Sequence, residues 1–318
     1  MKSELNTLPA IPAVRDDHIL WNQSVKAASM LYRWELVDSY ESILRLVHIH
    51  QSYLQQEPFK HDKTFLPQLE AQLPLVDGPR IWACFHVGPY ALMTRALIRR
   101  EYGIAILLKD EVFEEQYPMY VTQFEKSFGR EPKPSELQFV RSSGSTSLIQ
   151  LKRLLKDGFH VICYIDGEEG GSGEKGWTQI HVHNTTLDVR MGMSILSQLS
   201  GVPIRPVVLT TEGEKLTVRS KGDLYVNNRE QYQATMQSCY NLLEDLSAEE
   251  LLQWESIPRL FERTISTKIE TWEPPIWLPV YAKQKNMLLD VVSGKCAEVP
   301  AGQFEKMDTL RREFLKQI

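Results

Sequence analysis

Between residues 81 and 209, short apolar runs with the length of buried strands alternate with longer segments that have the spacing of amphipathic helices. This alternation predicts an α/β fold with a mostly parallel central sheet flanked by helices. The expected strands are Ile81–Phe85, Gly103–Leu108, Leu137–Val140, His160–Ile165, Thr178–Val182 and Ile204–Leu209, with an edge strand at Leu216–Arg219. The expected helices are Tyr90–Arg100, Val112–Phe128, Ser145–Lys156 and Asp188–Leu199.

The segments on either side of this core are expected to be helical extensions. Residues 1–16 are expected to form a loose arm, and apolar residues recur at helical spacing over residues 17–56. From residue 228 the chain is again expected to be mostly helical, apart from an ordered proline-rich loop at 272–279. The expected parts are an N-terminal arm and helical segment at 1–77, an α/β core at 78–225, and a C-terminal helical extension packed on that core at 226–318.

Composition excludes several classes of protein. The 318 residues are 42% hydrophobic and 24% charged, as in an ordinary folded protein. The net charge of −5 argues against a nucleic-acid partner, which would require a basic face. No window approaches the ~20 apolar residues of a transmembrane segment. The cysteines show no metal-ligand spacing, and Cys84 and Cys163 lie in apolar runs, so we expect a reduced, cytoplasmic protein without a structural metal.

His86 occupies a position suited to chemistry. It follows the strand-like run Ile81–Phe85, and Pro89 then stands where a helix can begin, because the N–H that proline lacks is unpaired there in any case. Open α/β sheets bind ligands at the carboxyl ends of their strands. An imidazole at such a turn can take a proton while an anion forms beside the helix N-terminus. The alternative is a buried histidine whose partners are backbone groups.

Two further strand ends carry polar residues. Arg141 follows the third run and could bind a phosphate or carboxylate, or stabilise an oxyanion; alternatively it is a surface residue paired with an acid. Asp166 opens an acidic, glycine-rich loop at residues 166–173, in which Asp166 or Glu168 could orient an imidazole. Glycines such as Gly167 let the backbone approach a ligand closely, although a solvated loop would have the same composition.

Two other patterns are interpreted as structural. His181 and His183 would share one face of a strand, but no third metal ligand is apparent nearby. Cys84 lies two residues before His86, deep in the expected sheet, where nothing would activate its thiol as a nucleophile.

Taken in order, these segments resemble the lysophospholipid acyltransferase superfamily, and within it the lipid A lauroyl/myristoyl acyltransferase branch. The resemblance covers roughly residues 78 to 210, and the order and spacing of its blocks carry it more than any single block. The four blocks are His86-Val-Gly-Pro-Tyr-Ala91, Val140-Arg141 ahead of a helix ending at Gly158, Tyr164-Ile-Asp-Gly167, and the segment from Gly192 through Pro206 to Val207.

The chain departs from this family in two respects. Ala91 stands where the family has an acid, five positions after the histidine, which hydrogen-bonds the imidazole and fixes its tautomer. We therefore expect another acceptor to hold His86, with Asp166 the first candidate, Glu168 the second and a backbone carbonyl the third. The membrane anchor that precedes the branch's catalytic region is also missing, which favours a soluble donor or acceptor.

The resemblance implies a soluble acyltransferase without a cofactor. The donor would be a thioester of coenzyme A or of a carrier protein, and the acceptor a small-molecule or carrier-bound amine or hydroxyl, in the biosynthesis of a lipid-like compound or a secondary metabolite. His86 would be the general base, oriented by Asp166. The residues expected to bind substrate are Gly88, Tyr90, Arg141, Gly167 and Glu168.

Two alternatives remain open, a catalytically inactive binding subunit of a biosynthetic complex, which Ala91 favours, and a thioester hydrolase. An acidic carrier protein would need a basic surface. Arg95, Arg99 and Arg100, on the helix after His86, could provide it or could form an ordinary solvated helix face.

Overall fold

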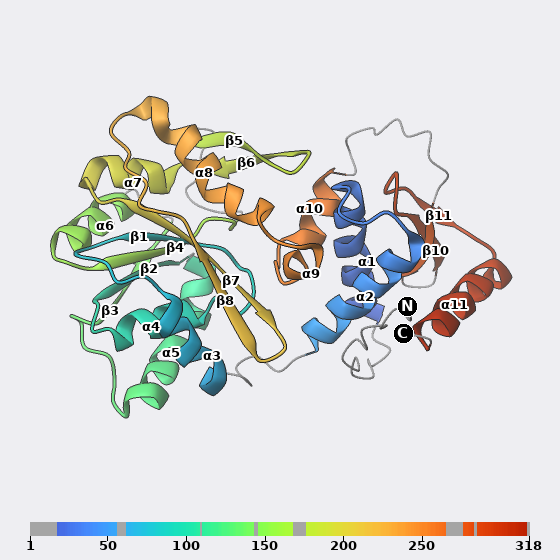
Figure 1. The fold of residues 1–318 in the computed structure, drawn as a ribbon, viewed down its shortest axis with the longest axis horizontal. Coiled ribbons are helices and arrows are strands. Elements are labelled where there is room, and N and C mark those ends of the chain that lie inside the picture. Colours follow the sequence, from blue (N-terminus) through green and yellow to red (C-terminus); the bar gives the residue numbers. More distant parts are fainter. Residues whose placement is uncertain are drawn as a thin grey trace, which may run out of the picture. The chain divides into compact units, whose positions relative to one another are not determined.

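The computed structural model describes residues 18–55, 62–108, 110–142, 146–167, 176–264, 276–282 and 285–316. The chain forms two compact units, Phe59–Leu246 and the combination of Met1–Pro58 with Ser247–Ile318 (Figure 1). This division differs from the expected boundaries at residues 78 and 226. Helices just outside those boundaries pack on the α/β sheet, whereas residues 18–54 pack against segments that follow residue 247.

The α/β unit is built on a six-stranded sheet with the order β3-β2-β4-β1-β7-β8 (Figure 1). All neighbouring strands are parallel except β8, which pairs antiparallel with β7 at one edge. The mostly parallel sheet and the edge strand are therefore confirmed. The strands are β1 (Ile81–Cys84), β2 (Ile104–Leu108), β3 (Leu137–Arg141), β4 (His160–Tyr164), β7 (Ile204–Glu212) and β8 (Lys215–Ser220).

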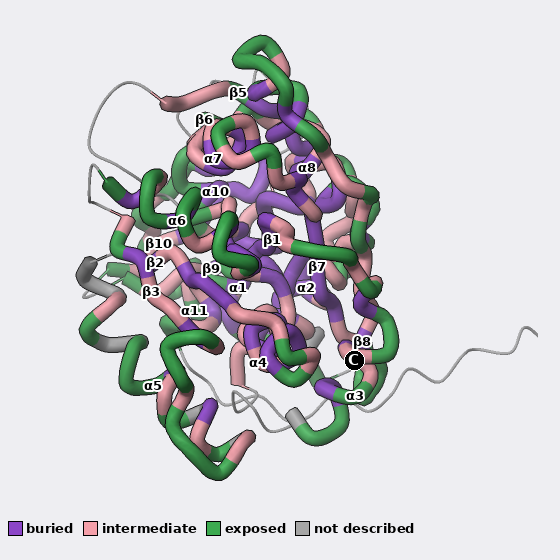
Figure 2. Tube along the Cα trace, turned by 90° about the vertical axis from the view of Figure 1, so that its left-hand side faces the viewer, coloured by how far each residue is buried: buried purple, intermediate pink, exposed green. Residues whose placement is uncertain are grey.

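Helices cover both faces of this sheet. On one face, Trp82 and Cys84 of β1 belong to a buried cluster with residues of α3, α4 and α5, and α6, α7 and α8 lie on the other face. All four residues of β1 are buried, as expected for a parallel strand covered on both sides (Figure 2). The helices are α3 (Asp62–Gln72), α4 (Leu92–Arg99), α5 (Asp110–Phe128), α6 (Ser147–Lys156), α7 (Gly192–Ser200) and α8 (Tyr232–Glu244), the last preceded by a 3₁₀ turn, Arg229–Gln231.

Glutamine side chains pair with the backbone at two strand edges. Gln72 of α3 accepts a hydrogen bond from the Val218 N–H of β8 at 3.0 Å and donates to the Leu216 carbonyl at 2.8 Å. Gln237 of α8 makes the same pair of bonds to the N–H and carbonyl of His181, at 2.7 and 2.8 Å. A primary amide has both a donor and an acceptor, so at each site it satisfies two backbone groups that a neighbouring strand would otherwise pair with.

The fifth expected strand lies outside the main sheet. β5 (Trp177–Val182) pairs antiparallel with β6 (Thr185–Arg190) in a separate hairpin, so the assignment of Thr178–Val182 to the parallel core is wrong. The helix expected from Asp188 begins only at Gly192, because polar and apolar residues alternate from Thr186 to Arg190 and this segment forms a strand.

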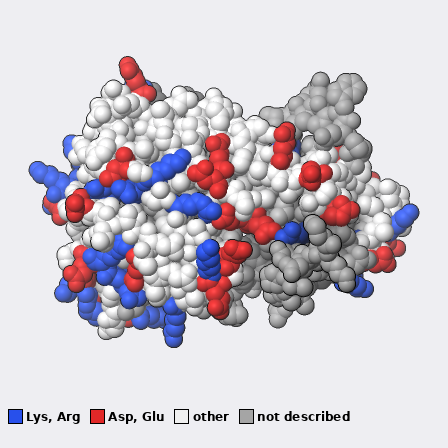
Figure 3. Space-filling view, in the orientation of Figure 1, with Lys and Arg blue, Asp and Glu red and all other residues white. Residues whose placement is uncertain are grey.

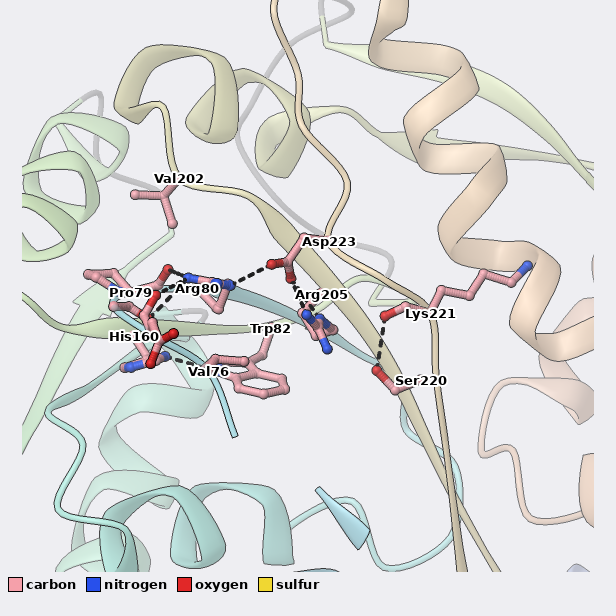
Figure 4. Close-up of polar contacts among 12 residues, drawn as sticks. Val76, Pro79, Arg80, Trp82, His160, Val202, Arg205, Ser220, Lys221 and Asp223 are labelled. Atoms are coloured by element: carbon pink, nitrogen blue, oxygen red, sulfur yellow. Dashed lines mark hydrogen bonds and ion pairs between the residues drawn. The ribbon is translucent and has the colours of Figure 1, made fainter. Parts of the chain in front are cut away.

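A polar cluster joins the amino ends of β1 and β7 (Figure 4). Asp223 accepts hydrogen bonds from Arg80 Nε at 3.0 Å and from Arg205 Nε at 2.7 Å, and all three side chains are at most 16% exposed. Beside it, the indole of Trp82 donates to Nδ1 of buried His160 at 3.1 Å. The shared carboxylate aligns the two strands that begin here.

The second unit combines helices with a small sheet. Its C-terminal part was expected to be mostly helical, but it contains a three-stranded antiparallel sheet, β11-β10-β9, and the Trp21 indole donates to the Pro279 carbonyl of β9 at 2.7 Å. Residues 1–16 and Trp272 lie outside the described residues. The elements are α1 (His18–Arg33), α2 (Tyr40–Leu54), α9 (Ala248–Leu251), α10 (Ile257–Thr264), β9 (Trp277–Ala282), β10 (Lys285–Asp290), β11 (Cys296–Glu298) and α11 (Ala301–Leu315).

Each unit contains a buried histidine that should make stability depend on pH. Burial lowers the pKa of His50 to about 4, and burial together with the charge of Arg80 lowers that of His160 to about 4. In the unfolded chain both titrate near 6.5. Between pH 6.5 and 4 the unfolded state therefore binds more protons, and the free energy of unfolding should fall as the pH falls, by up to ~1.4 kcal/mol per pH unit for each histidine.

Urea denaturation at pH 7, 6, 5 and 4.5 measures this dependence, and His160→Gln should flatten it for the α/β unit. Stability that stays constant from pH 7 to 5 in the wild-type protein would contradict the prediction.

Candidate active site

The register between β1 and β4 brings His86 and Asp166 together. These strands are parallel, with Cys84 opposite Tyr164, and the Ile165 N–H continues the ladder by donating to the Cys84 carbonyl at 2.9 Å. Two residues beyond Cys84 and Tyr164, His86 and Asp166 leave the carboxyl edge of the sheet side by side. This edge is where open α/β sheets bind their ligands.

Asp166 holds His86 through both of its carboxylate oxygens. Oδ1 lies 2.8 Å from Nδ1 of the imidazole, and Oδ2 accepts the His86 backbone N–H at 2.9 Å. A carboxylate only accepts hydrogen bonds, so Nδ1 carries the proton and Nε2 has the lone pair. The Asp166 side chain is 1% exposed and that of His86 28%. Asp166, the first of the acceptors expected to replace an acid at position 91, lies against the ring.

Two tyrosines contact the imidazole. The Tyr164 ring stacks on His86 with centroids 4.7 Å apart, and the Tyr90 ring meets it edge-on at 4.9 Å. The Tyr164 hydroxyl donates to the Tyr90 carbonyl at 3.4 Å. Burial raises the pKa of Tyr164 well above its ordinary value, so this hydroxyl keeps its proton. The imidazole therefore has one orientation, set by a hydrogen bond and by two aromatic contacts.

The turn after His86 depends on Gly88. Its φ of +59° lies in the left-handed region, where a side chain is strained. Pro89 follows, and its carbonyl accepts the Leu92 N–H at 3.0 Å as α4 begins. Ala91 is the residue before the helix and has no side chain that could hold an imidazole. The expected helix start at Tyr90 is thus two residues early, because 89–91 forms the turn.

Arg141 lies at the same edge but far from His86. Its strand, β3, is three positions from β1 in the sheet, or roughly 14 Å at the usual spacing of strands. Arg141 is paired with Glu114 of α5 at 2.6 Å, and its guanidinium lies 4.1 Å from the centre of the Phe113 ring. This arrangement matches the alternative interpretation of Arg141 as a surface residue paired with an acid. The distance between β3 and β1 also places Arg141 away from an oxyanion formed at His86.

Of the two remaining loop residues, only one can be placed. Gly167 follows Asp166, and a Cβ there would lie 3.5 Å from the Tyr164 carbonyl, an ordinary contact. The structure therefore does not require glycine at this position for steric reasons. Glu168, the second candidate acceptor, lies outside the described residues.

Two of the three arginines that could form a basic surface, Arg99 and Arg100, make contacts within the fold. Arg99 pairs with Glu70 of α3 at 2.8 Å, and Arg100 donates to the carbonyls of Leu73 and Pro74 at 2.7 and 3.0 Å. These contacts attach α3 to α4. On the face drawn in Figure 3, basic side chains lie among acidic ones.

The patterns set aside as structural keep that interpretation. Burial raises the pKa of the Cys84 thiol, which opposes formation of a thiolate nucleophile. β5 ends at Val182, and His183 lies in the following turn with a φ of +50°, so His181 and His183 do not share a strand face. Among the described residues, no group of three histidine, cysteine, aspartate or glutamate side chains could hold a metal ion.

Sequence reasoning missed the stacking of Tyr164 on His86. Tyr164 is the last residue of a buried strand, and only the register with β1 shows that its ring reaches the imidazole. No family model and no curated protein matches this sequence. In the part of the chain that the structure describes, we find no helix with the length and apolarity needed to cross a bilayer.

Proposed function

We propose that the protein is an acyltransferase that moves an acyl, aminoacyl or peptidyl group from a thioester of coenzyme A or of a carrier protein to an amine or hydroxyl acceptor. The observation that carries this proposal is the His86–Asp166 pair, with Nδ1 bound to a buried carboxylate 2.8 Å away at the ligand-binding edge of the sheet. The resemblance to acyltransferases over residues 78–210 supplies the reaction class.

In this mechanism Nε2 of His86 removes the proton from the acceptor as its nitrogen or oxygen attacks the thioester carbonyl. Asp166 stabilises the imidazolium that forms, through the bond at Nδ1. The tetrahedral intermediate then collapses with cleavage of the carbon–sulfur bond. The thiolate leaves and takes the proton back from Nε2, which regenerates the neutral imidazole.

The turn after His86 is the candidate site for stabilising the oxyanion. Pro89 has no N–H, so the donors of the turn are the N–H groups of Gly88, Tyr90 and Ala91, beside the positive end of α4. The positive φ of Gly88 gives this turn its shape. This assignment needs no contribution from Arg141, which is roughly 14 Å away in the sheet.

The alternative of an inactive binding subunit was favoured by Ala91, but Asp166 now supplies the hydrogen-bond acceptor that position 91 lacks. A thioester hydrolase would use the same base to activate water. The test is thiol release from acyl-CoA and acyl-carrier-protein thioesters, with and without a panel of amines and alcohols, followed by mass spectrometry of the products. Release that requires an acceptor supports transfer, free acid without acceptor dependence indicates hydrolysis, and no turnover of either donor class contradicts both enzymatic functions.

We propose that the Arg141 guanidinium binds a phosphate of the thioester donor. Arg141→Ala is then expected to raise the KM for the donor by about tenfold, or about 1.4 kcal/mol, and to leave kcat unchanged. Its ion pair with Glu114 is exposed and should contribute less than about 1 kcal/mol, so Tm should barely change. Glu114→Gln is the matched control, because it removes the same ion pair and keeps the cation. An equal change in KM for both variants would assign Arg141 a structural role.

A further inference from the structure

Tyr240 of α8 contacts both strand ends that carry the His86–Asp166 pair. Its hydroxyl donates a hydrogen bond to the Ile165 carbonyl at 2.7 Å, and Ile165 directly precedes Asp166. Its ring meets Phe85, which directly precedes His86, edge to face at a centroid distance of 5.1 Å and an interplanar angle of 89°. One side chain thus contacts the residue before each member of the pair.

The Ile165 backbone is bound on two sides. Its N–H donates to the Cys84 carbonyl of β1 at 2.9 Å, and its carbonyl accepts the Tyr240 hydroxyl. Strand pairing therefore sets the position of one end of this residue, and α8 sets the other. Asp166 follows at once, so the direction in which its carboxylate leaves the chain depends on both bonds.

Tyr240 cannot itself touch a substrate bound at His86. It is 2% exposed and its ring packs on Phe85, whereas His86 stacks on Tyr164, which packs against the cluster formed with α3, α4 and α5. Burial raises the pKa of Tyr240 well above its ordinary value, and the charge of Asp166 acts in the same direction, so the hydroxyl remains a donor. Its contacts are those of a positioning residue.

The helix that carries Tyr240 is itself anchored. Gln237, one turn earlier, bonds to both backbone groups of His181, and the Gln233 side-chain amide donates to the Gln179 carbonyl at 3.0 Å. The position of α8 is therefore set independently of the Tyr240 hydroxyl, and removal of that hydroxyl should release Ile165 without displacing the helix.

We propose that Tyr240 is a positioning residue that sets the geometry of the His86–Asp166 pair from the opposite face of the sheet, an inference that rests on the proposed function for its catalytic consequence. Without its hydroxyl, the Ile165 carbonyl loses a partner and the Asp166 carboxylate is no longer aligned with Nδ1. Misplacement of catalytic groups on the order of 1 Å costs about 100-fold in rate, so a smaller displacement should cost on the order of tenfold in kcat.

The test compares Tyr240→Phe with Tyr232→Phe, which removes a hydroxyl from the same helix at a similarly buried position that does not touch the pair. The first readout is the proton NMR resonance of the His86 Nδ1–H, assigned by its absence in His86→Ala. The second is kcat and KM for acyl transfer. Tyr240→Phe should shift or broaden the resonance and lower kcat about tenfold with an unchanged donor KM, whereas Tyr232→Phe should change neither.

An unchanged resonance in Tyr240→Phe would overturn the proposal, whether or not kcat falls, because the effect would then not act through His86. An equal effect of Tyr232→Phe would overturn it as well. If the wild-type protein transfers no acyl group, the proposed function fails while the resonance still tests the positioning role. Phe85→Leu, which removes the edge-to-face contact but keeps the Tyr240 hydroxyl and an apolar side chain at this buried position, provides a second variant should Tyr240→Phe not fold, and it should shift the same resonance.

Discussion

His86→Ala should lower the kcat of acyl transfer by at least about 100-fold and leave the fold intact. Removal of a positioned general base typically costs between about 100-fold and 10,000-fold. The His86 side chain is 28% exposed at the edge of the sheet, so its removal opens no cavity in the core. Steady-state kinetics with the donor and acceptor found in the thiol-release assay, together with circular dichroism, measure the two effects.

The matched control is His181→Ala. His181 is an exposed histidine of the hairpin β5-β6, and its ring contacts the Thr186 hydroxyl. Its removal should leave kcat unchanged. Near-normal turnover of His86→Ala with a verified thioester would show that another group is the base. Loss of folding in His86→Ala would contradict the expected stability, and its kinetics would then say nothing about the role of His86 in catalysis.

Asp166→Asn is the second substitution with a large expected effect, on the order of 100-fold or more in kcat. The carboxylate accepts two hydrogen bonds, from the His86 N–H and from Nδ1–H. An asparagine has one acceptor and one donor. If its oxygen keeps the backbone N–H, its amide N–H₂ faces Nδ1 and forces the tautomer in which Nε2 carries the proton, so the base cannot accept one. If the amide is reversed, two donors face each other at the backbone.

The double variant of His86→Ala with Asp166→Asn should lose little beyond the more damaging single variant, because groups that act as a unit are not additive. Asp188→Asn, at an exposed aspartate of β6, is the control for the same chemical change and should leave kcat unchanged. Additive losses in the double variant would show that Asp166 does not act through His86. Thermal unfolding of Asp166→Asn should show a cost of about 1–3 kcal/mol, since a buried hydrogen bond is lost.

Local patterns in the sequence were sufficient for the elements of the main sheet. The apolar runs that became β1, β2, β3, β4 and β7 are short and are separated by segments with helical periodicity, so each run by itself indicates a strand. Thr178–Val182 has the same appearance but pairs with 185–190 instead, because adjacent strands joined by a short turn form a hairpin.

The sequence also predicted both members of the candidate site. His86 and Asp166 each follow a buried strand, and the carboxyl ends of parallel strands meet at one edge of the sheet. The sequence ranked Asp166 first as the partner of His86, but it could not show that Asp166 lies beside His86 while Arg141, which also follows an expected strand, lies far from it. That distinction depends on strand order. β4 is the neighbour of β1, and β3 is three positions away.

Strand order and register arise from contacts between residues far apart in the sequence, for which no local pattern exists; Cys84 and Tyr164, for example, pair although they are 80 positions apart. The same holds for Tyr240, a buried tyrosine in an amphipathic helix with no motif around it, which reaches Ile165 only when α8 packs on the sheet. The sequence by itself determined which elements form and which residues stand at their ends. Only the tertiary structure decided which of those ends are neighbours, because packing of helices on both faces of the sheet selects one strand order among several compatible with the same local signals.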